Sequence, residues 1–92
     1  MKPDLHEPGP AAARRRRRED DARAYARLLL SDIRLYNEED VILGRMNADI
    51  SRRLGAQIER ARALYRRRFQ DEAPFDREIV STLAGGDRHR LG

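Results

Sequence analysis

Arginine side chains are the groups in this chain whose number and spacing suggest a chemistry, and that chemistry is anion binding. Every basic residue except Lys2 is an arginine, and a guanidinium group can donate two parallel hydrogen bonds to a carboxylate or phosphate. One set is the consecutive run Arg14, Arg15, Arg16, Arg17 and Arg18, and the other is a row at steps of seven, Arg53, Arg60 and Arg67. The run predicts contacts with phosphates, whereas the row either follows a nucleic-acid backbone or selects a protein surface electrostatically.

Acidic neighbours offer these arginines partners within the chain. Helical spacing predicts three groups of ion pairs: Asp49 with Arg52 or Arg53, Glu59 with Arg62, and Arg67 and Arg68 with Asp71 and Glu72. Wherever such pairs form, fewer guanidinium groups remain for a partner molecule.

Catalytic chemistry is poorly supported. The two histidines, His6 and His89, lie near the chain ends, and there is no cysteine to act as a nucleophile or form a disulfide. Glu38, Glu39 and Asp40 are consecutive, so a helix points their carboxylates in different directions, and an acidic turn is a better interpretation than a cation site. We expect no enzyme, no catalytic, metal-binding or cofactor-binding residue, no cofactor and no small-molecule substrate.

Length and composition limit the size of the core. The chain has 92 residues, of which 39% are charged and 5% aromatic, so we expect one small domain that needs further stabilisation. Without disulfides, that stabilisation would come from association with itself, as a homodimer, or with a larger protein client. No segment resembles a targeting signal or is long enough to cross a bilayer, so we expect a cytoplasmic protein without membrane contact.

The elements that position the arginines are predicted to be helices. We interpret residues 1–18 as a disordered basic tail, 19–84 as the helical domain and 85–92 as a flexible tail. The first helix should begin between Arg14 and Asp21. Its main apolar stripe is spaced for a helix and consists of Ala22, Tyr25, Ala26, Leu29, Ile33 and Tyr36.

The second helix should run from Ile50 to Phe69, and its apolar side chains also recur at steps of three and four. Between the helices, either Asn37 caps a new helix at Glu38, or the first helix runs on to Gly44; a break near 44–47 is favoured. Gly55 marks either sequence drift or the close approach of a neighbouring helix. After Pro74, a short helix capped by Asp76 should end at Gly85-Gly86.

We therefore predict an all-α fold, a helical hairpin with a short C-terminal helix, completed by dimerisation into a bundle. The buried seam should contain Leu29, Ile33, Tyr36, Ile50, Leu54, Ile58 and Tyr65. A second set at steps of seven, Leu28, Leu35 and Ile42, should remain exposed and contact a second protomer or a client. Tyr36 and Tyr65 are the expected energetic anchors of that interface.

Two segments, AYARLLLSDIRLYNEEDVILGR (24–45) and IERARALYRRRF (58–69), resemble a little-characterised helical segment of bacterial proteins. That segment occurs as short stand-alone chains and as an extension of regulatory or zinc-ribbon proteins. DIRLYNE, Gly44-Arg45 and the spacing of Arg62, Tyr65 and Arg68 carry the resemblance, which covers residues 22–70 and touches 75–87. The resemblance implies a regulatory or interaction element, without an activity that transfers to this chain, which lacks zinc-ribbon cysteines.

The expected function is a non-enzymatic helical assembly or adaptor module that mediates protein–protein interaction. The alternative is a sequence-nonspecific nucleic-acid-binding protein that uses the arginine run and the arginine-rich second helix.

Overall fold

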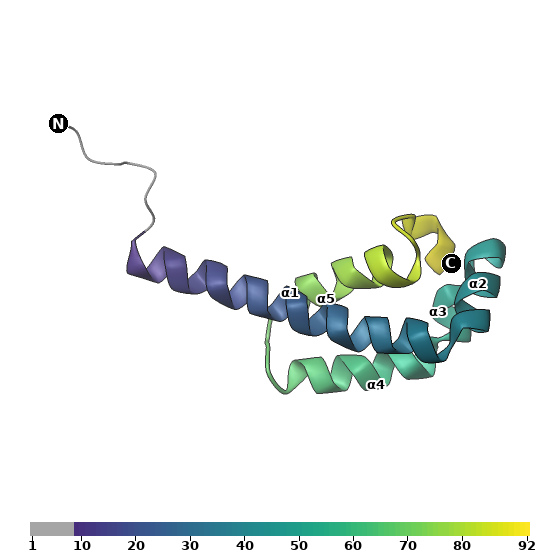
Figure 1. The fold of residues 1–92 in the computed structure, drawn as a ribbon, viewed down its shortest axis with the longest axis horizontal. Coiled ribbons are helices and arrows are strands. Elements are labelled where there is room, and N and C mark those ends of the chain that lie inside the picture. Colours follow the sequence, from purple (N-terminus) through teal and green to yellow (C-terminus); the bar gives the residue numbers. More distant parts are fainter. Residues whose placement is uncertain (1–8) are drawn as a thin grey trace.

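The chain folds as an all-α protein, and none of the residues that the computed structural model describes, 9–92, lies in a strand (Figure 1). Five α-helices are followed by a π-helical turn, η1, and a 3-10 turn, η2. Their bounds are α1 Pro10–Tyr36, α2 Glu38–Asn47, α3 Ile50–Arg53, α4 Gly55–Arg66, α5 Ala73–Glu78, η1 Ile79–Leu83 and η2 Arg88–Leu91. The predicted fold class is confirmed, whereas dimerisation stays a prediction.

The hairpin is formed by α1 and the α3–α4 segment, which runs back along it, while α5 lies along the opposite side of α1 (Figure 1). Helical hydrogen bonding continues across the α3–α4 boundary, because Ile58 N–H donates to Leu54 O at 2.9 Å. The core between these helices contains Ala22, Ala26, Leu30, Ile33, Val41, Ile50, Leu54, Ile58, Ala61, Tyr65, Phe75, Ile79, Leu83 and Ala84. Most of the predicted seam is therefore buried, with Leu29 packed at its edge.

The start of α1 corrects one prediction. Residues 10–18 are helical, not a disordered tail, and residues 1–8 lie outside the described part of the chain. Pro10 occupies the first turn, where its missing N–H and fixed φ do not disturb a helix. The arginine run thus lies on α1, ahead of the acidic residues that were expected to open the helix.

The connection between the two long helices breaks twice. One break is at Asn37, whose side-chain amide donates to Ile33 O at 2.8 Å, so a new helix begins at Glu38. The other is at Ala48, in the left-handed conformation with φ 54°. Gly44 does not end a helix: it is buried inside α2 against Ile50. The break falls just after the predicted 44–47 because Gly44 serves close packing, not termination.

The C-terminal residues correct another prediction, because 85–92 is not a free tail. Gly85, with φ 64°, and Gly86, with φ 90°, turn the chain after η1, and η2 follows with Leu91 packed against the core. Arg45 Nε donates to Leu83 O at 2.8 Å and Arg90 Nη1 donates to Ala84 O at 3.2 Å. The two guanidinium groups thus satisfy carbonyls at the negative end of this helix, which fixes η2 and α2 beside it.

Candidate interaction surfaces

An exposed apolar set remains after the core is complete. Leu28, Leu35 and Ile42, called here the apolar stripe, are 58%, 62% and 57% exposed. Along α1, Leu28 and Leu35 lie on the side opposite the buried residues Ala26 and Ile33, because helical residues advance by about 100° each. Their predicted exposure is confirmed, whereas their contact with a partner stays a prediction.

Two further apolar residues near the end of α1 and in α2 share this exposure. Met46 is 75% exposed and was missed from the sequence, although it lies one turn after Ile42. Tyr36 is 79% exposed, so its place in the buried seam was wrong. The helix ends at Tyr36 and the chain turns at Asn37, so no second helix covers its ring.

Tyr65 has the opposite fate. It is fully buried, and its hydroxyl donates to the Asp71 carbonyl at 2.6 Å, while Tyr25, Phe69 and Phe75 surround its ring at centroid distances of 5.3–6.4 Å. Burial raises the pKa of the hydroxyl. Tyr65 is therefore a core residue and cannot anchor an interface of the folded chain, as the sequence had suggested.

The row of arginines at steps of seven is not uniform. Arg53 is partly buried and its Nε donates to Asp49 Oδ1 at 2.7 Å, so it closes the start of α3. Arg60 and Arg67 are exposed and form no ion pair within the described residues. Only two members of the row are thus available to a partner in the way that the spacing predicted.

The acidic residues after α4 pair with other arginines than expected. Arg62 Nη1 lies 2.7 Å from Glu72 Oε1 and 2.9 Å from Asp76 Oδ1, and Arg66 also binds Glu72. The predicted partners were Arg67 and Arg68, but α4 ends at Arg66 and the chain turns back, which brings Glu72 beneath the last turn. Arg62 also lies over the Phe75 ring, 4.8 Å from its centroid. This ion-pair cluster holds α5 against α4.

The cluster predicts acid sensitivity. Hydrogen bonds from Arg66 and Arg62 hold the pKa of Glu72 below its ordinary value of 4.5. A carboxyl whose pKa is lower in the folded state stabilises the fold fully above its unfolded value, and this contribution disappears as the pH falls through the folded value. Thermal melts of Glu72→Gln should therefore lie below those of the parent at pH 7, and the difference should vanish well below pH 4.5.

Glu39→Gln is the matched control for that experiment, because Glu39 is exposed and forms no ion pair in residues 9–92. A Glu72→Gln difference that stayed constant with pH would contradict the role given to the charged carboxylate.

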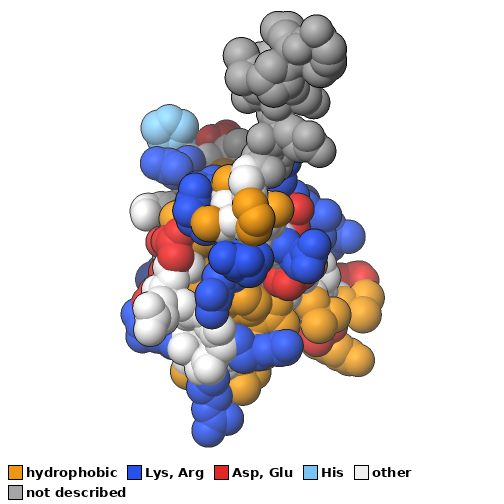
Figure 2. Space-filling model, turned by 90° about the vertical axis from the view of Figure 1, so that its left-hand side faces the viewer, with side chains coloured by type: hydrophobic (Ala, Val, Ile, Leu, Met, Phe, Trp, Pro, Cys, Tyr) orange, Lys and Arg blue, Asp and Glu red, His pale blue; other side chains and the backbone are white. Residues whose placement is uncertain are grey.

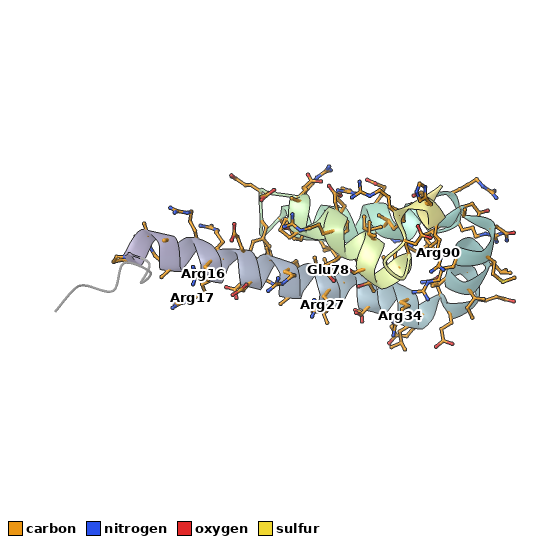
Figure 3. All side chains as sticks on the ribbon, turned by 90° about the horizontal axis from the view of Figure 1, so that it is seen from above. Arg16, Arg17, Arg27, Arg34, Glu78 and Arg90 are labelled. Atoms are coloured by element: carbon orange, nitrogen blue, oxygen red, sulfur yellow. The ribbon has the colours of Figure 1, made fainter. Side chains whose placement is uncertain are left out.

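The carboxyl group of Glu78 is the buried acidic group of the core. Its side chain is 6% exposed, with Oε1 3.3 Å from Arg27 Nε and 3.3 Å from Thr82 Oγ1. Figure 3 shows Arg27 of α1 and Glu78 of α5 side by side. This pair joins α1 to α5, which makes Glu78 a structural residue.

The consecutive arginines occupy the part of α1 that extends beyond the other helices (Figure 1). Successive helical residues point about 100° apart, so Arg14–Arg18 surround the helix on all sides. Figure 3 shows Arg16 and Arg17 on this free part, and Figure 2, which looks along the molecule from that end, shows basic side chains on several sides of the view. All five are exposed and form no ion pair within the described residues.

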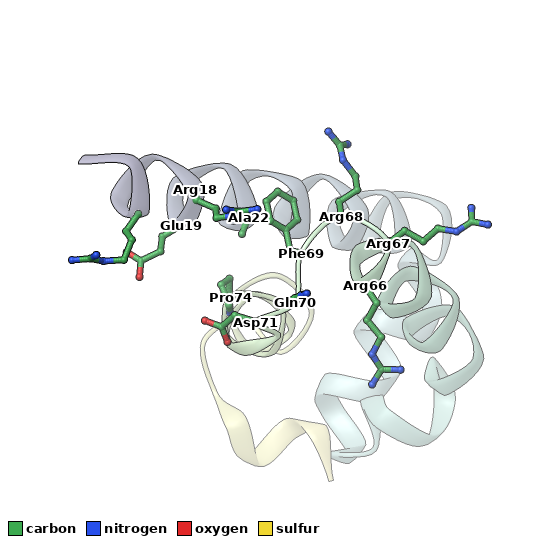
Figure 4. A pocket seen from close by; sticks show the side chains of 11 residues that line it. Arg18, Glu19, Ala22, Arg66, Arg67, Arg68, Phe69, Gln70, Asp71 and Pro74 are labelled. Atoms are coloured by element: carbon green, nitrogen blue, oxygen red, sulfur yellow. The ribbon is translucent and has the colours of Figure 1, made fainter. Parts of the chain in front are cut away.

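A cavity of about 570 Å³ lies where the free part of α1 meets the α4–α5 connection (Figure 4). Arg15 and Arg18 line it from α1, and Arg66, Arg67 and Arg68 line it from the end of α4. Glu19, Ala22, Phe69, Gln70, Asp71 and Pro74 complete the lining. Two arginine groups that are about fifty positions apart in the sequence thus share one site, which no sequence spacing could have indicated.

Other chemistry has little support in the described residues. Within 9–92 no three histidine, aspartate or glutamate side chains cluster in a way that could hold a metal ion. His89 is exposed in η2, and His6 lies outside the described residues. None of the helices in the described part of the chain is long and apolar enough to span a bilayer.

No family model, curated protein or solved structure matches the chain. The resemblance of residues 22–70 to a bacterial helical segment therefore stays a prediction, and function must be inferred from the surfaces themselves.

Proposed function

We propose that this protein is a non-enzymatic helical assembly module that pairs with a second copy of itself through the apolar stripe. The observation that carries the proposal is the exposure of Leu28, Leu35 and Ile42 although the core is already filled. A spacing of seven is the repeat by which one helix packs against another with the same repeat.

The residues beside the stripe favour a second copy as the occupant. With Leu28 and Leu35 at the first position of a heptad, Ala24 and Ser31 take the fourth, and Arg27 and Asp32 take the flanking positions. In a parallel pair, Arg27 of each copy lies opposite Asp32 of the other, so the surface is complementary to itself. The two Arg14–Arg18 runs would then lie at the same end, but such exposed charges are screened over about 8 Å at physiological salt.

The test is the mass of the assembly in solution, measured by sedimentation equilibrium. Leu35→Glu places a carboxylate in the stripe and should weaken self-association at least tenfold, because the charge would have to be buried without a partner. The melting temperature of the monomer should not change, since the Leu35 side chain is 62% exposed. Leu64→Glu is the matched control: Leu64 is also exposed, at 44%, but lies on α4, and its mass should equal that of the parent.

Two outcomes would overturn the proposal. A parent protein that sediments at 10.7 kDa over the whole concentration range would exclude a second copy as the occupant. A Leu35→Glu variant with the parental mass would show that the stripe is not the interface. Orientation is tested by Ala24→Cys, which introduces the only cysteine and should form a disulfide-linked dimer only in a parallel pair.

Sequence-nonspecific binding of nucleic acid is the second candidate function. What favours it is that five exposed arginines on one helix end have no acidic partner within residues 9–92.

A further inference from the structure

We propose that the arginine-lined cavity between α1 and the α4–α5 connection binds the phosphate backbone of single-stranded nucleic acid, with the free part of α1 as its continuation. The proposal rests on the second candidate function and is independent of self-association. It assigns a site, Arg15, Arg18, Arg67, Arg68 and Phe69, that the arginine spacings alone did not define.

The cavity has an excess of positive charge that the chain does not neutralise. Arg66 is held by Glu72, and Arg68 lies over the Tyr25 ring, 4.4 Å from its centroid, with no carboxylate beside it. Arg15, Arg18 and Arg67 form no ion pair within the described residues. The acidic lining residues are Glu19 and Asp71, and the Asp71 carboxylate already accepts the Ala73 N–H at 3.0 Å. An anion in the cavity therefore meets several guanidinium groups without a competing acid for each.

The free part of α1 has an electrostatic defect that the same ligand would relieve. No acidic residue lies in the first turn, so the positive end of the helix dipole faces five arginines. Within that run, Arg14 and Arg18 are four positions apart and Arg15 and Arg18 three, and like charges at these spacings destabilise a helix. Phosphates bound along this segment would remove both penalties, so binding should increase its helix content.

The shape of the positive surface favours a long polyanion over a small one. Positive charge continues from the cavity onto Arg14, Arg16 and Arg17, which lie outside its lining but on the same helix end. The ring of Phe69, half-buried, forms part of the cavity wall (Figure 4). Aromatic rings at a basic groove stack against unpaired bases, which are accessible in single strands and not in a duplex. A single strand thus uses both the charge and the apolar wall.

The experiment measures fluorescence anisotropy of a labelled oligo(dT) strand, titrated with the whole chain from about 50 to 200 mM salt. For about five phosphate contacts, the affinity should fall roughly 100-fold over this range. The triple variant Arg15→Gln/Arg18→Gln/Arg67→Gln should bind at least tenfold more weakly at the lowest salt, and its slope of log K against log salt should be smaller by about 2.

The matched control is Arg34→Gln/Arg77→Gln/Arg88→Gln. These three arginines are also exposed, form no ion pair within residues 9–92 and do not line the cavity. The net charge changes equally in both triples, so a difference between them reports position and not overall charge. Circular dichroism at 222 nm supplies a second readout: saturating oligo(dT) should increase the helix signal of the parent and of the control, but not of the cavity variant.

Each remaining outcome has a distinct meaning. Equal binding by the two triples would overturn the cavity site while leaving nucleic-acid binding in place. No binding by the parent at the lowest salt would overturn both the site and the second candidate function. Competition by poly-glutamate as strong as by unlabelled oligo(dT) would overturn the nucleic-acid assignment, because the cavity would then accept an acidic protein segment equally well.

Discussion

Replacing Tyr65 with alanine should lower the free energy of unfolding by about 3–5 kcal/mol, as for other large aromatic residues in protein cores. Tyr65 is fully buried and contacts the rings of Tyr25, Phe69 and Phe75. Its hydroxyl also ties the core to the α4–α5 connection through the Asp71 carbonyl. A domain of this size rarely has more than about 3–5 kcal/mol of stability from a single core, so the variant should be largely unfolded at room temperature. Urea titration followed by circular dichroism measures the effect.

The same titration separates the ring from the hydroxyl. Tyr65→Phe keeps the ring and should cost about 1–3 kcal/mol, since the Asp71 carbonyl loses its donor at 2.6 Å. Tyr36→Ala is the matched control, because Tyr36 is 79% exposed and its loss should change stability by no more than about 0.5 kcal/mol in dilute protein. Equal effects at the two tyrosines would show that the aromatic cluster does not hold the fold.

Replacing Gly44 with alanine should destabilise the protein by about 1–3 kcal/mol, although alanine favours a helix. A Cβ atom at Gly44 would lie 2.7 Å from Ile50 Cγ1 and 3.2 Å from Ile50 Cα, closer than carbon atoms normally approach. Ile50 is fully buried and cannot move outward without opening the core, so α2 and α3 would have to separate. Thermal and urea melts of the variant would register this separation.

Gly55 provides the control for Gly44. A Cβ atom at Gly55 would meet no atom within 4 Å, and its backbone conformation is open to any residue. Gly55→Ala should therefore stabilise the protein by about 0.4–1 kcal/mol through the lower entropy of the unfolded chain. Effects of the same sign at both glycines would contradict the close contact of α2 and α3. The result at Gly55 also answers the question that its sequence position raised, since no neighbouring helix of this chain approaches it.

Local periodicity predicted much of the core correctly. Ala22, Ala26 and Ile33 of α1 and Ile58 and Tyr65 of α4 are buried, because a helix of fixed pitch brings residues at steps of three and four to one face. It failed among the consecutive leucines 28–30, where Leu30 is fully buried and Leu29 only partly, because neighbouring positions differ by about 100° and the sequence does not mark the centre of the stripe.

The candidate surfaces divide in the same way. The exposure of Leu28 and Leu35 could be predicted because one helix cannot bury two opposite faces in a small hairpin. The arginine contacts could not, since they depend on where the chain turns. Arg45 caps a helix about forty residues later, and Arg62 takes the acids that Arg67 and Arg68 were expected to bind.

By itself, then, the sequence determined the helical class, the faces of the helices and the absence of cysteine chemistry. These properties follow from composition and from a period within one helix. Only the tertiary structure decided which arginines are neutralised and which meet at the cavity between α1 and the end of α4. Ion pairs and cavities depend on distances between segments, and those distances are set by the breaks at Asn37 and Ala48 and by the return of the chain after Arg66.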